Sequence, residues 1–77
     1  MPTPYERYFE LIREKVAEDR YPSSQLMDRL EAAITSQEQL EEYLDTLFEK
    51  IENDHYPSLQ MLDRVERLGP IAHVLNR

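Results

Sequence analysis

The side chains in this sequence best suited to proton transfer or metal binding at neutral pH are two histidines, at positions 55 and 73. His55 follows Glu52 and Asp54, so a metal or small-molecule site at this corner is conceivable, but no recognised ligand spacing accompanies it. The serines and carboxylates form no readable set of nucleophile, base and orienting group. A single glycine excludes a glycine-rich phosphate loop. The sequence predicts no catalytic, cofactor or metal site, and we expect a protein that is not an enzyme.

Carboxylates dominate the charge of the chain, which is −7 at neutral pH. Between residues 36 and 54 seven acidic residues stand against one base, Lys50. Five of them recur at helical steps and form a predicted acidic ridge: Glu38, Glu42, Asp45, Glu49 and Glu52. The ridge is either a solvated helix face or a surface for a basic partner, including a DNA mimic that occupies the site of a nucleic-acid-binding protein. Direct binding of nucleic acid is disfavoured, because phosphates would be repelled.

The chain contains an internal duplication with an offset of 35 residues. Alignment of 5–33 on 40–68 gives twelve identities in 29 pairs, against roughly two expected by chance. From the repeated corner onward, the residues shared by both copies are Asp19/Asp54, Tyr21/Tyr56, Pro22/Pro57, Ser23/Ser58, Gln25/Gln60, Asp28/Asp63, Arg29/Arg64 and Glu31/Glu66. Below, the counterpart of a residue is the one 35 positions away in the other copy.

The repeated Tyr-Pro-Ser sequence predicts a structural corner between two helices. We expect Tyr21 and Tyr56 to plug the open end of each hairpin, and Pro22 and Pro57 to fix the bend. Ser23 and Ser58 fit N-cap positions.

The repeated Asp-Arg pairs have two interpretations. Asp28, Arg29, Asp63 and Arg64 either bridge to neighbouring helices, or they form a polar docking patch that is presented twice. Neighbouring residues on a helix do not face each other, so each needs a partner elsewhere. On the second interpretation all four are partner-binding candidates.

Start and stop signals predict four helices. Thr3 and Glu6 form a capping box for a helix over about 4–18. Further helices are expected over about 24–34, 37–53 and 59–68, the third one capped through Thr35 with Glu38 or through Ser36 with Gln39. Gly69 and Pro70 should end the last helix and open a separate C-terminal turn over 70–77.

These elements predict an all-α fold in one domain, 1–77, with repeat one over about 4–35 and repeat two over 36–69. Two copies are fewer than a solenoid needs. We therefore expect two tandem helical hairpins packed as a small four-helix bundle, within one chain or swapped between chains.

Apolar side chains in excess of what a small bundle buries predict self-association through Tyr5, Tyr8, Leu11 and Phe48. The expected function is a small protein–protein interaction module, regulatory or adaptor-like, that forms a homodimer. The alternative is the acidic inhibitor or DNA mimic described above. The lack of cysteine, of a signal peptide and of a membrane span favours a cytoplasmic protein.

Overall fold

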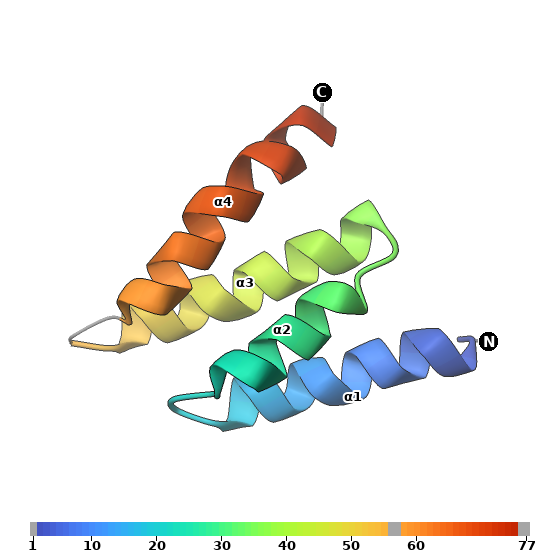
Figure 1. Cartoon of the computed structure of the whole chain (residues 1–77), viewed down its shortest axis with the longest axis horizontal. Coiled ribbons are helices and arrows are strands. Elements are labelled where there is room, and N and C mark those ends of the chain that lie inside the picture. The colour runs from blue at the N-terminus through green and yellow to red at the C-terminus, as the bar shows by residue number, and fades with distance from the viewer. Residues whose placement is uncertain (1, 56–57, 76–77) are drawn as a thin grey trace.

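The computed structural model describes residues 2–55 and 58–75, and this part of the chain is all-helical, as predicted. Four helices follow one another: α1 (Pro4–Glu18), α2 (Ser24–Ala32), α3 (Gln37–Asn53) and α4 (Leu59–Leu75) (Figure 1). The predicted bounds of the first and third helices are confirmed, and α2 ends two residues earlier than predicted.

Side-chain caps fix the helix starts. Thr3 Oγ1 accepts a hydrogen bond from the Glu6 backbone N–H at 3.2 Å, and the Glu6 carboxylate reaches back to Thr3, which confirms the capping box. At α3, Ser36 Oγ accepts from the Gln39 N–H at 3.2 Å. The Gln39 side chain accepts from Thr35 rather than from the Ser36 N–H, so Ser36 is the N-cap, but neither predicted capping box forms in full.

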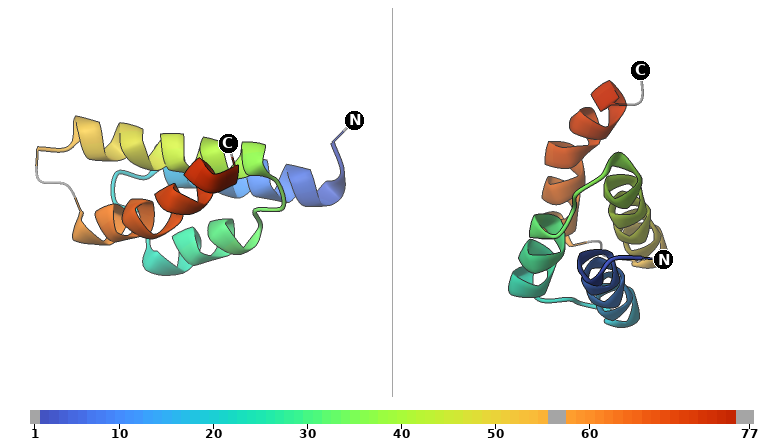
Figure 2. Two further views of the ribbon diagram at one scale, coloured as in Figure 1. Left: turned by 90° about the horizontal axis from the view of Figure 1, so that it is seen from above. Right: turned by 90° about the vertical axis from the view of Figure 1, so that its right-hand side faces the viewer.

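The helices form two hairpins that lie side by side (Figures 1 and 2). Helices α1 and α3 run in the same direction, α1 packs on α2 and α3, and α2 also packs on α3. Helix α4 packs on α3 and diverges from α1. The molecule is flat, with extents of 38 × 29 × 18 Å. A closed four-helix bundle is not confirmed.

Apolar side chains from all four helices form the core. Its main cluster consists of Phe9, Val16, Met27, Leu30, Ala33, Tyr43, Leu47 and Met61. A smaller cluster, formed by Leu40, Leu44 and Ala72, lies between α3 and the far end of α4. Burial of these side chains is the main favourable contribution to the stability of so short a chain.

The prediction that Gly69 and Pro70 end the last helix was wrong. Helix α4 continues through both residues to Leu75, with Pro70 inside it, and no glycine has a positive φ. A proline within a helix removes one backbone hydrogen bond and crowds the carbonyl four residues before it, at a cost of about 3 kcal/mol. Ala72 packs on Leu40 and Leu44, with the partly buried Val65 and Leu68 beside them, so tertiary contacts act against the local stop signal.

Lys50 joins the two hairpins at the far end of α1. Its ammonium group donates to the backbone carbonyls of Ala17, in the last turn of α1, and of Asp19, the C-cap of that helix. A cation at this position also interacts favourably with the helix dipole. Burial lowers the Lys50 pKa, while the Asp19 charge acts in the opposite direction.

Candidate functional site

A groove lies between the N-terminal half of α1 and the start of α3, with a volume of about 860 Å³. Its charged lining is acidic, with Arg7 as the one base among the lining residues, and the carboxylates are Glu6, Glu10, Glu14, Glu38 and Glu42. Tyr5 and Leu11 add exposed apolar surface to it. We call this feature the acidic groove.

Arg13 holds the two walls of the acidic groove together. Its guanidinium binds the Glu10 carboxylate and donates from Nη1 to Thr46 Oγ1 on α3 at 3.4 Å. Thr46 is buried and donates in turn to the Glu42 carbonyl at 2.9 Å. The hydrogen bond from Arg13 lowers the pKa of the Glu10 carboxyl, which burial alone would raise, so Glu10 stays ionised at neutral pH.

The predicted acidic ridge divides between two surfaces. Glu38 and Glu42 line the acidic groove, whereas Asp45, Glu49 and Glu52 are exposed on α3 outside it. The three carboxylates on α1 were missed by the sequence analysis. Their four-residue spacing, at positions 6, 10 and 14, was the available signal, since residues four apart share one helix face.

The four self-association candidates are all exposed, as that prediction requires. Tyr5 and Tyr8 lie with their ring centroids 6.2 Å apart, and the Tyr5 hydroxyl donates to the Ala32 carbonyl at 3.5 Å. Leu11 and Phe48 are about half exposed. Whether these side chains form an interface stays a prediction.

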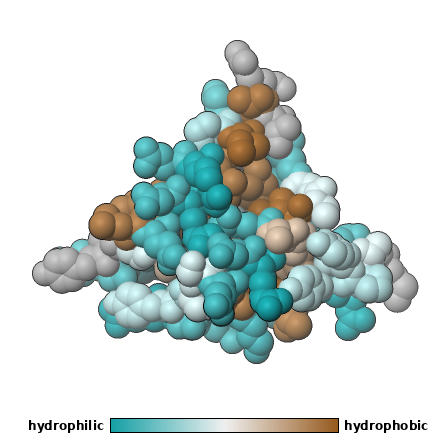
Figure 3. Space-filling view, viewed as in Figure 1, coloured by the Kyte–Doolittle hydropathy of each residue, from teal (hydrophilic) through white to brown (hydrophobic). Residues whose placement is uncertain are grey.

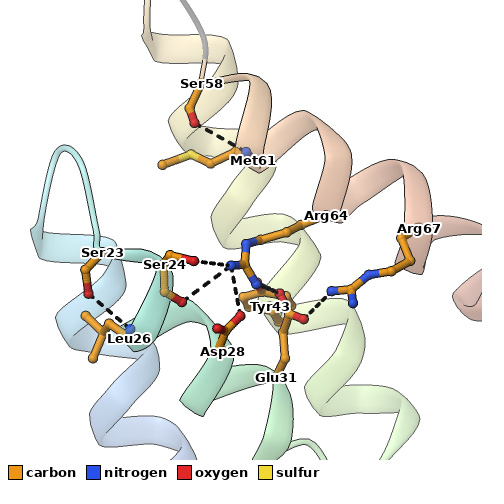
Figure 4. Close-up of polar contacts among 10 residues, drawn as sticks. All are labelled: Ser23, Ser24, Leu26, Asp28, Glu31, Tyr43, Ser58, Met61, Arg64 and Arg67. Carbon is orange, nitrogen blue, oxygen red and sulfur yellow. Dashed lines mark hydrogen bonds and ion pairs between the residues drawn. The ribbon is translucent and has the colours of Figure 1, made fainter.

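A polar junction joins α4 to α2, with Arg64 at its centre (Figure 4). The buried Arg64 guanidinium pairs with Asp28 at 2.9 Å and with Glu31, and it donates to Ser24 Oγ at 3.2 Å. Glu31 also accepts from Arg67 and from the Tyr43 hydroxyl. Glu31 therefore receives donors from both helices of the second hairpin.

The contacts of the junction give a structural role to one of the two repeated aspartates and to one of the two repeated arginines. Arg64 and Asp28 bridge neighbouring helices, and burial of Arg64 makes it unsuitable for docking a partner. Arg29 and Asp63 are exposed and make no hydrogen bond or ion pair with the described part of the chain, so they stay candidates.

Electrostatics keep the junction in one charge state. Burial alone would lower the Arg64 pKa, but hydrogen bonds to Glu31 and Asp28 outweigh it and hold the pKa above its ordinary value. Burial, together with the neighbouring Glu31 carboxylate, raises the pKa of the Tyr43 hydroxyl well above its ordinary value. Tyr43 therefore remains a hydrogen-bond donor at any physiological pH.

The raised Tyr43 pKa predicts a loss of stability at alkaline pH. Above about pH 10, where an unperturbed tyrosine ionises, the unfolded chain releases the Tyr43 proton while the folded chain keeps it. The free energy of unfolding should then fall by about 1.4 kcal/mol per pH unit from this group alone. Urea unfolding measured from pH 8 to 11.5 checks this.

A matched pair of variants isolates the effect of Tyr43. Tyr43→Phe should reduce the fall in the free energy of unfolding above pH 10 by about 1.4 kcal/mol per pH unit. At neutral pH it should cost about 1 kcal/mol, because one hydrogen bond is lost. Tyr8→Phe removes the counterpart hydroxyl, which has no hydrogen-bond partner in the described residues, and should leave the slope unchanged. Equal slopes for all three proteins would show that Tyr43 does not carry the effect.

The corner between α1 and α2 differs from the prediction in one residue. Tyr21 is 60% exposed and stacks with Arg20 instead of plugging the hairpin, so that prediction was wrong. Pro22 is buried and fills the position, because its rigid ring needs no polar partner. Ser23 Oγ accepts from the Leu26 N–H at 3.1 Å, which confirms the predicted cap.

In the second corner, Ser58 Oγ accepts from the Met61 N–H at 3.4 Å, as predicted. Tyr56 and Pro57 lie outside the described residues.

No group of three or more histidine, aspartate or glutamate residues that could hold a metal ion occurs among residues 2–55 and 58–75. Within these residues, none of the helices is both long and apolar enough to cross a membrane. Comparisons with protein-family models, curated proteins and solved structures gave no match. The arguments about function therefore rest on the acidic groove and the junction.

Proposed function

We propose that this protein is a small, non-enzymatic protein-interaction module whose acidic groove binds a cationic segment of a partner protein. The supporting observation is the groove itself, in which five carboxylates from two helices surround exposed apolar surface, while Arg7 is the one base in the lining and Arg13 pairs with Glu10 alone among these carboxylates. If the acidic face of α3 were only a solvated surface, we would not expect a second helix to present carboxylates to the same groove.

The lining suggests the chemistry of the ligand. Lysine or arginine side chains complement the carboxylates, and a guanidinium can bind a carboxylate through two parallel hydrogen bonds. Tyr5 and Leu11 favour an apolar residue beside those cations. The volume lies at the upper end of the range for small-molecule sites, which favours a peptide segment over a metabolite. Opposite charge would also speed the encounter.

The acidic inhibitor or DNA mimic is the second candidate. It is favoured by Asp45, Glu49 and Glu52, which extend the negative surface along α3 beyond the groove. On this alternative the partner is a nucleic-acid-binding protein, and the whole acidic face of α3 takes part rather than the groove alone.

Two double variants with equal charge separate the candidates. Glu14→Gln with Glu42→Gln removes two carboxylates from the groove, and Glu49→Gln with Glu52→Gln removes two from α3 outside it. The probe is a fluorescently labelled amphipathic peptide of lysine and leucine, measured by anisotropy at about physiological ionic strength. The groove variant should weaken binding about tenfold, since each lost ion pair is worth at most about 1 kcal/mol at an exposed site.

The control variant should bind within a factor of two of the original chain. Equal losses for both variants would contradict the groove and favour the extended acidic face. No binding of the peptide by the original chain would overturn the proposal. Circular dichroism of each variant checks that the helices are retained.

A further inference from the structure

The polar contacts at the junction and at Lys50 share one direction, from cations and a hydroxyl on the second hairpin to acceptors on the first, whereas Arg13 on the first hairpin donates to Thr46 on the second. Arg64 pairs with Asp28 and Glu31, and the Tyr43 hydroxyl donates to Glu31. Lys50 donates to carbonyls at the end of α1. Figure 4 shows the first two of these links, drawn between α4, α3 and α2.

The duplication supplies a second set of the same groups. The counterparts of the three donors are Tyr8, Lys15 and Arg29 on the first hairpin, and we call them the head surface. The counterparts of the two carboxylate acceptors, Asp28 and Glu31, are Asp63 and Glu66 on α4. With Leu62 we call these residues the tail surface. All six residues are exposed.

These groups have almost no partners in the chain itself. Lys15 makes one long ion pair with Glu18, at 4.0 Å. The other polar groups of the head and tail surfaces make no hydrogen bond or ion pair with the described residues. Hydrophilic side chains form a band across the middle of the face drawn in Figure 3, and apolar ones follow the upper part of α4.

The burial of side chains in the core also differs between the two copies. Met27 on α2 is 0% exposed within the main cluster, which includes residues of the second hairpin, while its counterpart Leu62 on α4 is 38% exposed. Tyr43 on α3 is 0% exposed, while its counterpart Tyr8 is 38% exposed. Each hairpin thus carries a surface that is buried only where the other hairpin lies against it.

We propose that copies of this chain associate head to tail, with the head surface of one copy against the tail surface of the next. Arg29 then pairs with Asp63 and Glu66 of the second copy, and the Tyr8 hydroxyl donates to its Glu66. The new interface repeats the junction already present within the chain, with the charges required on each side. It is independent of the acidic groove, whose lining does not include these residues.

The inferred assembly is open-ended, because the two contacting surfaces differ. Such a heterologous interface extends into a stack unless its rotation closes a ring. Stacks of helical hairpins gain stability when neighbours cover each exposed face, and two hairpins are fewer than such architectures usually need. The copy-to-copy junction lacks two polar groups of the internal one. The counterpart of Ser24 is Leu59, and the counterpart of Arg67 is Ala32. The association should therefore be reversible and concentration-dependent.

Charge reversal on each surface tests the proposal by sedimentation velocity, from micromolar to millimolar protein at low salt. The original chain should form species larger than a dimer as its concentration rises. Arg29→Glu and Glu66→Arg should each raise the concentration needed for association by about tenfold or more, because like charges replace a complementary pair. An equimolar mixture of the two variants should regain association, since each then meets its complement.

Matched controls carry the same charge changes elsewhere. Arg20→Glu and Glu14→Arg, both at exposed positions outside the two surfaces, should associate as the original chain does. A chain that stays monomeric at millimolar concentration would overturn the proposal. So would a dimer that neither reversal affects, or a mixture of reversed variants that stays monomeric while both are helical by circular dichroism.

Discussion

Arg64→Met should lower the free energy of unfolding by about 3 kcal/mol. The substitution keeps most of the side-chain length but leaves Glu31 partly buried with one cation fewer, and it removes the link from α4 to Asp28 and Ser24. We expect the lower end of the range for a broken buried ion pair, because Glu31 keeps Arg67 and Tyr43 as donors. The buried Arg64 Nε has no hydrogen-bond partner among residues 2–55 and 58–75, which offsets part of the gain from burying this residue.

Such a loss is large for this chain. A domain of this length has a stability of about 4–12 kcal/mol, so the variant approaches the limit of folding. Urea unfolding followed by circular dichroism measures the difference, and the midpoint of thermal unfolding should fall by about 10–20 °C.

The duplication provides the control for Arg64. Arg29→Met makes the same chemical change at the counterpart position, where the side chain is exposed, and should alter stability by no more than about 0.5 kcal/mol. This comparison is made at low micromolar concentration, so that association of copies does not contribute. Equal costs at the two positions would contradict the role given to the junction.

Met27→Ala should destabilise the fold by about 3 kcal/mol. Met27 is fully buried in the main cluster, and its truncation leaves a cavity that the surrounding helices fill only in part. Of the core side chains, Met27 is the most informative because its counterpart, Leu62, is of similar size and lies at the surface.

Leu62→Ala should cost about 1 kcal/mol or less in the same dilute urea titration, since its side chain is already partly in water. A similar cost at both positions would show that the core extends over Leu62 and that the tail surface is not free. The pair therefore tests the packing of α4 as well as the energy of the core.

Local sequence signals predicted most of the secondary structure. Thr3, Ser23 and Ser36 each cap a helix through contacts within one turn, and such contacts do not depend on the rest of the fold. The end of α4 was not predictable in this way, because packing of Ala72 on α3 outweighs the stop signal at Pro70.

The candidate site was only half predictable. The ridge on α3 is visible in the sequence, but its pairing with Glu6, Glu10 and Glu14 requires α1 to lie parallel to α3. The sequence equally could not tell that Pro22, and not Tyr21, is the buried residue of the first corner.

By itself the sequence determined that this protein is helical, acidic and duplicated, because helix capping, charge and repetition are properties of residues close together along the chain. Only the tertiary structure decided that Arg64 is buried while Arg29 is exposed, and that Met27 is core while Leu62 is surface. The physical reason is that burial and ion pairing depend on which helix lies alongside. Arg64 and Met27 lie on faces that meet the other hairpin, whereas their counterparts Arg29 and Leu62 lie on faces that are open to solvent.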